Sequence, residues 1–242
     1  MKGKYDFLVF DMDNTITESC TQITDDMANT LNNLKEELVF ITGTHSTEIK
    51  RMISSKLNRS HHILANIGTH HLFINKTIEK EIYKETLKED EKKEIITALK
   101  KLKNTYNLKP LTYEKDQIQD RGSQITLSIL GRTAPKEKKT SYDANKEKRK
   151  KFVKFLKKTI KKKTYEFGIG GTTSIDITRK GNNKGVALEK FIKKFDISKK
   201  KLIFFGDQLS PGGNDYPVIK TGIKCIKVKN PNETLEILKK LL

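Results

Sequence analysis

Short apolar runs that end in polar or small residues recur along this chain of 242 residues. Tyr5–Phe10, Leu38–Ile41 and Leu202–Phe205 each lead directly into a polar turn. Apolar runs of this length, bounded by turn residues, are typical of strands buried on both faces of a parallel sheet. Between them, apolar residues at helical spacing predict helices over Asp25–Lys35 and Gly185–Phe195. The pattern therefore predicts an α/β fold, in which ligands bind beyond the carboxyl ends of the parallel strands.

The middle of the chain follows a different pattern. Its predicted elements are helices over about 88–106 and 143–159 and strands over Gln124–Leu130, Tyr165–Ile169 and Ser174–Thr178. Apolar residues alternate with polar ones in the first of these strands, which favours a sheet covered on one face. We therefore expect an α+β cap domain, residues 81–182, inserted into a Rossmann-like parallel-sheet core formed by residues 1–80 and 183–242.

Composition narrows the class of protein. The chain has 49 basic and 30 acidic residues, a formal net charge of +19. Such charge suits nucleic acid, an anionic membrane surface or a phosphorylated small molecule. The longest apolar runs are far shorter than the roughly 20 residues that span a bilayer, and no signal-peptide pattern precedes the first strand. Cys20 and Cys225 are too few for a disulfide framework. We expect a cytoplasmic protein.

The strongest chemical signal is the pair of carboxylates that follows the first predicted strand. Asp11, Asp13 and Thr15 alternate along the turn. In such a turn one carboxylate can attack phosphorus while the other, when protonated, donates to the leaving oxygen. The turn's backbone N–H groups can bind phosphoryl oxygens. The alternative is an ordinary turn that ends a strand.

Residues at the ends of other predicted elements favour the chemical interpretation. Thr42 offers a hydroxyl at the end of the second strand, and Lys184 offers a positive charge at the start of a helix. Asp207 and Asp215 add hard oxygen ligands that suit Mg²⁺. Each residue alone also fits a turn, a surface lysine or a helix cap. Together, in this order, they fit phosphoryl transfer, which needs positioning and charge neutralisation.

This set of residues resembles the motifs of the haloacid dehalogenase (HAD) superfamily, whose members transfer a phosphoryl group through an aspartyl-phosphate. Phe204–Asp215 looks like the metal loop of eukaryotic-type phosphomannomutases and of their bacterial hydrolase relatives, the subfamily with an inserted α+β cap. Phe167–Asp176 and Ile125–Arg132 resemble cap segments of the same family. The similarity covers essentially the whole chain.

The resemblance assigns roles to individual residues. It implies that Asp11 is the nucleophile and Asp13 the general acid/base, and that Thr42 and Lys184 hold the phosphoryl group. The implied Mg²⁺ site comprises Asp11, Asp13 (through its main-chain carbonyl), Asp207, Asn214 and Asp215. The implied substrate contacts in the cap are Arg121, Arg132, Lys139, Ser174 and Asp176.

Three departures from the family pattern bear on the reaction. Asn14 stands where the family usually has Gly. Cys20 and Lys139 stand where the mutases have arginines. A mutase must hold a bisphosphorylated intermediate at both ends, whereas a phosphatase needs only water to reach the aspartyl-phosphate. The main hypothesis is therefore a Mg²⁺-dependent phosphatase that acts on a sugar phosphate or similar phosphomonoester through Asp11.

Two rival functions stay open. The alternative is a phosphomannomutase or phosphoglucomutase, and a less favoured third is a nucleic-acid-binding protein on the same scaffold. The third rests on the positive charge, much of it in the lysine-rich helix 146–163. The expected ligand is a phosphorylated small molecule and no membrane is expected; a homodimer is compatible with the sequence.

Two pairs of adjacent histidines fit no zinc spacing. The pairs are His61–His62 and His70–His71. Side chains of adjacent residues diverge, so we expect these histidines on loops or at the surface rather than in one metal site.

Overall fold

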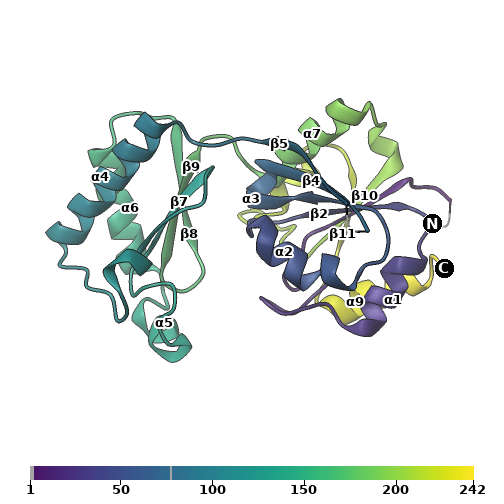
Figure 1. Ribbon diagram of the computed structural model, residues 1–242, viewed down its shortest axis with the longest axis horizontal. Helices are drawn as coiled ribbons and strands as arrows, with labels where there is room; N and C mark the ends of the chain where they lie inside the picture. Colours follow the sequence, from purple (N-terminus) through teal and green to yellow (C-terminus); the bar gives the residue numbers. More distant parts are fainter. Residues whose placement is uncertain (1–2, 77) are drawn as a thin grey trace. The chain divides into compact units, whose positions relative to one another are not determined.

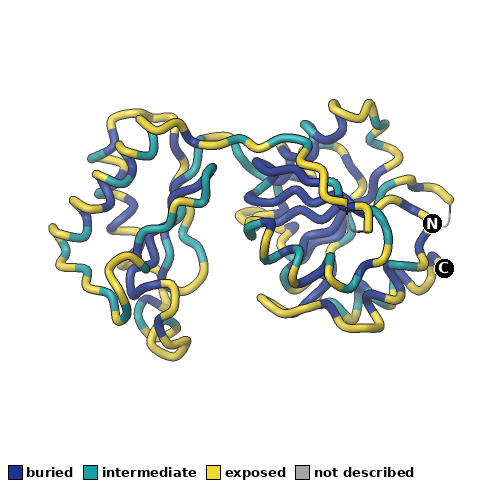
Figure 2. The backbone as a smooth tube through the Cα atoms, in the orientation of Figure 1, coloured by how far each residue is buried: buried dark blue, intermediate teal, exposed yellow. Residues whose placement is uncertain are grey.

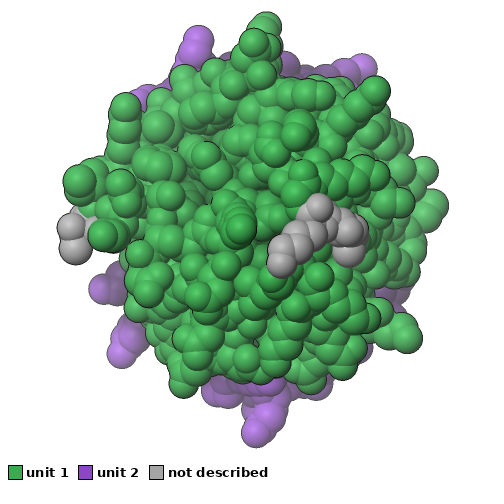
Figure 3. All heavy atoms as spheres, turned by 90° about the vertical axis from the view of Figure 1, so that its right-hand side faces the viewer, with its two compact units in different colours: residues 1–84, 182–242 green, residues 85–181 purple. Residues whose placement is uncertain are grey.

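The computed structural model describes residues 3–76 and 78–242 and divides into two compact units (Figures 1 and 3). The core unit consists of the chain up to Lys84 together with Asn182–Leu242, and the inserted unit consists of Glu85–Gly181. The last strand before the inserted unit runs from Ile78 to Lys84 and so crosses position 80, where the sequence pattern placed the boundary.

A seven-stranded sheet forms the centre of the core unit, in the order β11-β10-β1-β2-β3-β4-β5. Neighbours from β11 to β3 are parallel, and β4 and β5 add an antiparallel edge. The parallel strands are β1 (Phe7–Phe10), β2 (Glu37–Ile41), β3 (His61–Leu64), β10 (Leu202–Gly206) and β11 (Lys224–Lys227); the antiparallel ones are β4 (His70–Asn75) and β5 (Ile78–Lys84). Phe10 pairs with both Phe40 and Phe205, so the central strands end at the same level.

Helices cover both faces of this sheet because the buried strands present apolar side chains alternately to either side. Phe10, Phe40 and Phe205 belong to one apolar cluster, whereas Val9 and Phe204 belong to the other. The first cluster includes residues of α1 (Asp25–Asn33), α2 (Ser46–Met52) and α9 (Pro231–Lys239), and the second includes residues of α7 (Lys184–Phe195) and α8 (Tyr216–Ile219). Figure 2 shows the strands as a buried layer. Short connections complete the unit: η1 (Ser54–Lys56), α3 (Ala65–Gly68) and η3 (Lys199–Lys201).

The inserted unit has a four-stranded antiparallel sheet in the order β6-β7-β9-β8. Its strands are β6 (Ile118–Asp120), β7 (Gln124–Ser128), β8 (Tyr165–Gly170) and β9 (Ser174–Arg179), and its helices are α4 (Glu89–Thr105), η2 (Glu114–Asp116), α5 (Lys136–Tyr142) and α6 (Glu147–Thr159). Alternate strand residues such as Ile125 and Ile175 pack with apolar residues of α4 and α6 on one face (Figure 1). The opposite face carries polar residues such as Thr126 and Asp176, which pair across β7 and β9.

The structure confirms the predicted fold class, a parallel-sheet α/β core with a separate antiparallel sheet. The predicted helix 143–159 is shorter than expected. The carboxylate of Asp143 accepts hydrogen bonds from the backbone N–H groups of Lys148 and Arg149, so the helix begins only at Glu147. The preceding residues form α5, which the sequence pattern did not indicate.

The expectation for the histidines was wrong. His61 and His62 lie on β3 and His70 and His71 lie on β4, and all four are buried. His62 Nδ1 lies 2.9 Å from His71 Nε2 across the paired strands. The two rings pack against Phe191 and Phe195 of α7, and burial lowers the pKa of His62 to about 4 and that of His71 to about 3.

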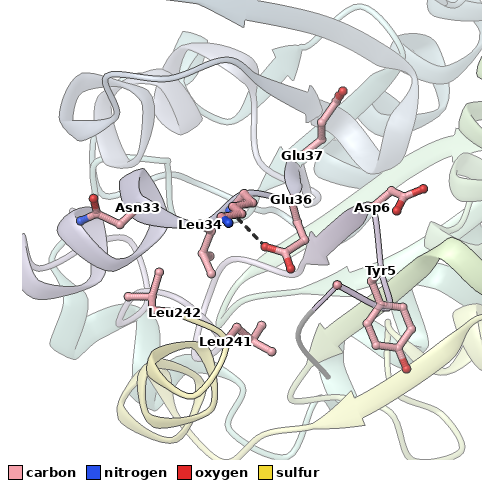
Figure 4. Close-up of a pocket in the computed structure, with 10 residues that line it drawn as sticks. Tyr5, Asp6, Asn33, Leu34, Glu36, Glu37, Leu241 and Leu242 are labelled. Carbon is pink, nitrogen blue, oxygen red and sulfur yellow. Dashed lines mark hydrogen bonds between the residues drawn. The ribbon is translucent and has the colours of Figure 1, made fainter.

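One cavity of the core unit lies at the opposite edge of the sheet from the strand ends described below (Figure 4). It encloses about 450 Å³, and its lining includes Tyr5 and Asp6 before β1, Glu36 and Glu37 at the start of β2, and Leu241 near the C-terminus. No helix within the described ranges is long and apolar enough to cross a membrane.

Candidate active site

The first carboxylate of the predicted motif lies directly beyond the central strand of the sheet. Asp11 follows β1, and its backbone N–H donates to the carbonyl of Phe205 on β10 at 2.9 Å. Thr42 follows the neighbouring β2, and Asp207 follows β10. Because these parallel strands end at one level, the structure brings all three residues to the same edge, as the sequence pattern predicted.

The turn after β1 is held by its own backbone. The N–H of Asn14 donates to the carbonyl of Thr17 at 2.8 Å, and those of Thr15 and Ile16 donate to the carbonyl of Met12. Asn14 has a φ of 59°, a left-handed conformation that Asn adopts more readily than most residues. The turn therefore keeps a left-handed geometry with Asn at the position where the family usually has Gly.

The carboxylate of Asp13 points to a different partner from that of Asp11. Asp13 Oδ1 accepts a hydrogen bond from the backbone N–H of Cys20 at 2.9 Å. Cys20 is itself left-handed, with a φ of 64°. The sequence carried no signal for this contact, because any residue other than proline supplies a backbone N–H.

Lys184 contacts one carboxylate from each of the two chain segments that form the core unit. Asn183 caps α7 by accepting from the N–H of Val186, so Lys184 is the first residue of the helix. Its side chain is 2% exposed, and Nζ lies 2.5 Å from Oδ1 of Asp11 and 2.5 Å from Oδ1 of Asp215. The buried ammonium is therefore shared between the carboxylate after β1 and the far end of the loop after β10.

The loop after β10 folds back so that its last residue lies against its first. Asp215 Oδ2 accepts from the backbone N–H of Gln208 at 3.0 Å. A Cβ added to Gly206 would lie 2.5 Å from this same oxygen, so only glycine allows the approach. Asp215 is fully buried, whereas Asn214 is exposed on the same loop.

Asp11, Lys184 and Asp215 are buried charged groups, and each affects the pKa of its neighbours. Burial raises the pKa of Asp11 to about 7, against the opposing attraction of Lys184. Burial alone would lower the pKa of Lys184, but attraction to Asp11 and Asp215 outweighs it and leaves the pKa above its usual value. Lys184 is therefore a fixed positive charge beside the carboxylate of Asp11.

Three carboxylates of the site fit a divalent metal ion. One oxygen each of Asp11, Asp207 and Asp215 lie within 4.8 Å of one another. Carboxylate oxygens are the donors that Mg²⁺ prefers, and a lone ammonium cannot neutralise three carboxylates. Asp13 lies outside this carboxylate cluster, and the resemblance gives it a metal-binding role only through its main-chain carbonyl.

Thr42 lies at the end of the neighbouring strand, β2. It is 3% exposed, and its Oγ1 accepts from the backbone N–H of Thr44 at 3.2 Å. Its own N–H donates to the carbonyl of Leu64 on β3. Within the described part of the chain its hydroxyl donates to no acceptor, so the proton is available to an anionic group.

In the inserted unit, one set of predicted substrate contacts gathers on the polar face of the sheet. Asp176 Oδ1 accepts from Gln124 Nε2 and from Thr126 Oγ1, both at 2.7 Å. Burial raises the pKa of Asp176, while the nearby charge of Arg121 opposes the rise. Ser174 lies two residues before Asp176 on the same strand.

Two other predicted contacts, Arg132 and Lys139, follow β7 in the chain. Arg132 is exposed, and its carbonyl accepts from Lys139 Nζ of α5 at 3.0 Å. Arg121 lies before β7 and Arg132 after it, so the two arginines flank the strand rather than form one cluster.

The fold and the carboxylate site define an enzyme of the HAD type. A model of the eukaryotic phosphomannomutase family matches residues 27–242, and the chain belongs to this family. The phosphomannomutase of Encephalitozoon cuniculi is 27% identical over 233 residues, which cover 93% of this chain and 89% of that protein. The phosphomannomutase of Saccharomyces cerevisiae is 24% identical over 241 residues, 97% of this chain and 93% of that protein.

Solved structures share the fold at lower identity. Plasmodium falciparum IMP-nucleotidase has a TM-score of 0.69 and 18% identity, over 99% of this chain and 70% of that one. A haloacid dehalogenase-like hydrolase from Bacteroides thetaiotaomicron has a TM-score of 0.61 and 15% identity, over 99% and 100%. The resemblance inferred from the motifs is thus confirmed. The match to the family model begins after Asp11 and Asp13, whose place in the site rests on the geometry above.

Proposed function

We propose that this protein is a Mg²⁺-dependent phosphotransferase that moves a phosphoryl group within a hexose phosphate by way of an aspartyl-phosphate on Asp11. The single observation that carries the proposal is the shared contact of Lys184 Nζ with Asp11 and Asp215, next to the Asp207 carboxylate. Membership of the phosphomannomutase family supports the mutase outcome rather than the phosphatase that the sequence departures favoured.

In the proposed reaction, Asp11 starts with a phosphoryl group that it has taken from a hexose bisphosphate. In the first half, a free hydroxyl of the hexose monophosphate attacks this phosphorus while Asp13 takes the proton of the hydroxyl, and the bond from phosphorus to Asp11 breaks. The sugar is then a bisphosphate and Asp11 is a free carboxylate. In the second half, Asp11 attacks the phosphorus at the other position of the sugar. The bond from that phosphorus to the sugar oxygen breaks, Asp13 gives its proton to that oxygen, and the sugar keeps only the newly added phosphate.

The surrounding residues stabilise charge during transfer. Lys184 and the Thr42 hydroxyl are placed to bind phosphoryl oxygens at the strand ends. Mg²⁺, held by Asp11, Asp207 and Asp215, would neutralise phosphoryl charge and favour the ionised form of Asp11. The N–H of Cys20 fixes the carboxylate of Asp13 for its proton transfers.

Residues of the inserted unit are proposed to bind the second phosphate. Arg121 and Arg132 suit this role because a guanidinium binds phosphate through two parallel hydrogen bonds. Ser174 and Asp176 would contact the sugar, and Lys139 would add charge near Arg132.

Hydrolysis of a phosphomonoester is the second candidate, and two residues favour it. Cys20 and Lys139 replace arginines of the mutase pattern. Fewer guanidinium groups would hold the bisphosphorylated intermediate less tightly, so water would reach the aspartyl-phosphate more often.

One assay tests both candidates. Mannose 1-phosphate is incubated with Mg²⁺ and a trace of hexose bisphosphate, and mannose 6-phosphate and inorganic phosphate are measured together. Conversion to mannose 6-phosphate well above phosphate release supports the mutase. Release of phosphate alone would replace it with the phosphatase, and neither product would contradict both.

A further inference from the structure

A turn with an unusual backbone follows β3 at the edge of the sheet that carries the active site. Asn66, Ile67 and Gly68 have φ values of 49°, 57° and 76°, so three consecutive residues are left-handed. Glycine adopts this region without cost and Asn tolerates it, but for a β-branched residue such as Ile67 it is an outlier. Backbone strain of this kind persists only where neighbouring structure holds it, and it gathers at functional sites.

The left-handed turn is bonded to the loop after β2. The N–H of Ile67 donates to the carbonyl of Thr42 at 2.8 Å, and the N–H of Asn66 donates to the carbonyl of Thr44 at 3.1 Å. A Cβ built on Gly43 would lie 3.7 Å from Cγ1 of Ile67, which is ordinary contact. The turn therefore supports the segment that carries the Thr42 hydroxyl.

The same turn packs against the first turns of α7. A Cβ added to Gly68 would lie 2.2 Å from Cβ of Ala187 and 3.2 Å from its Cα. Ala187 comes three residues after Lys184 on this helix. Glycine at position 68 is thus required for the turn after β3 to approach the helix that carries the buried Lys184.

The carboxamide oxygen of Asn66 is buried without a hydrogen-bond partner among the described residues. The residue as a whole is 5% exposed. An unsatisfied buried carboxamide is costly, so natural structures retain one where something else completes it. The unpaired atom is an oxygen that can only accept, so its partner must be a donor such as a hydroxyl.

We propose that the left-handed turn Asn66–Gly68 sets the distance between Thr42 and Lys184, and that Asn66 and Gly68 are positioning residues of phosphate binding. This inference rests on the proposed function for its ligand. The turn is hydrogen-bonded to the backbone of Thr42, and through Gly68 it packs against Ala187 on the helix that begins with Lys184. The Asn66 carboxamide oxygen accepts a hydrogen bond from a hydroxyl of the phosphorylated substrate when that substrate is bound.

The test uses the full chain and a matched control. Gly68→Ala places a methyl group against Ala187, whereas Gly222→Ala introduces the same left-handed strain, φ 80°, where nothing lies within 4 Å. The dissociation constant of inorganic phosphate with Mg²⁺ is measured by titration calorimetry, beside kcat on mannose 1-phosphate and the melting temperature. We expect Gly68→Ala to weaken phosphate binding and to lower kcat at least tenfold. Gly222→Ala should stay within twofold of wild type for both.

Two further variants separate positioning from folding. Gly68→Ala with Ala187→Gly should recover most of the phosphate affinity, because the second change removes the obstructing methyl group. Asn66→Gly keeps the left-handed backbone and loses only the carboxamide, so kcat should fall about fivefold at an unchanged melting temperature.

Each outcome decides the inference. Equal phosphate affinity and kcat in Gly68→Ala and Gly222→Ala, or full activity of Asn66→Gly where Gly68→Ala does not fold, would overturn it. A wild type that binds phosphate but does not turn over mannose 1-phosphate contradicts the proposed function alone. In that case the phosphate dissociation constants of Gly68→Ala and Gly222→Ala still test the role of the turn. A wild type that neither binds phosphate nor turns over overturns both.

Discussion

The side-chain nitrogen of Lys184 lies 2.5 Å from Oδ1 of Asp11, a member of the carboxylate cluster. The two residues come from opposite ends of the core unit, before and after the inserted unit in the chain. Their contact depends on the parallel sheet, which places the end of β1 beside the helix that returns from the insertion. The site therefore exists only when both parts of the core unit are folded together.

Replacement of Lys184 should damage both catalysis and stability. Lys184→Met removes the cation that two buried carboxylates share, so we expect kcat to fall by roughly 10²–10³-fold. The free energy of unfolding without metal should fall by about 3 kcal/mol. Lys193→Met, an exposed change on the same helix, should alter neither. Steady-state kinetics and urea denaturation measure the two effects, and normal turnover by Lys184→Met would contradict the assigned role.

The buried histidine pair should make the core unit sensitive to acid. The pKa values of about 4 for His62 and about 3 for His71 lie below the unfolded value, so the unfolded chain binds more protons between pH 6.5 and 4. Stability is then complete above pH 6.5 and is lost as the pH falls, by about 3 kcal/mol for His62 by pH 4. The combined change His62→Gln and His71→Gln should flatten this slope in chemical denaturation. An unchanged slope would show that other groups cause it.

Introduction of the missing arginine should shift the outcome toward transfer. Cys20 already has a left-handed backbone, so Cys20→Arg adds no new class of strain. We expect the ratio of mannose 6-phosphate to released phosphate to rise about tenfold, the worth of one charge-assisted contact. Cys20→Ser, which keeps the N–H donor to Asp13, is the control and should leave the ratio unchanged. An unchanged ratio in Cys20→Arg would show that position 20 does not affect the balance between transfer and hydrolysis.

A buried arginine should determine the stability of the inserted unit. Arg149 is 1% exposed; its Nε donates to Asp143 at 2.8 Å, and its guanidinium also donates to the carbonyls of Gly170 and Gly171. Arg149→Met leaves these acceptors without a donor and should cost about 3–5 kcal/mol. Lys150→Met, an exposed neighbour, should stay within about 0.5 kcal/mol.

Hydrogen exchange of β8 and β9 measures the change in the inserted unit directly. Faster exchange in Arg149→Met than in Lys150→Met is the expected result. Equal exchange in the two variants would show that the buried ion pair does not support this sheet.

The sequence was sufficient to predict elements whose residues match their degree of burial. The apolar runs before Asp11, Thr42 and Asp207 predicted three parallel strands and the edge at which their polar residues meet. Lys184 and Asp215 could also be expected there, because each lies at the end of an element. The pattern is readable because strands buried on both faces carry almost no polar residue.

Features that depend on tertiary packing could not be read in the same way. His62 and His71 are polar residues in buried strands, and their aromatic neighbours from α7 are far away in the sequence. The backbone N–H of Cys20 has no side-chain signature. The left-handed Ile67 contradicts local preference, since surrounding structure holds it there.

The most direct test of the central claim compares wild type and Asp11→Asn on mannose 1-phosphate with Mg²⁺ and trace hexose bisphosphate. Both proteins are quenched in acid and examined by mass spectrometry for a phosphoryl group on the peptide that contains residue 11. We expect an acid-stable phosphoryl adduct and mannose 6-phosphate with wild type, and neither with Asp11→Asn. Turnover by Asp11→Asn at the wild-type rate would contradict phosphoryl transfer through Asp11.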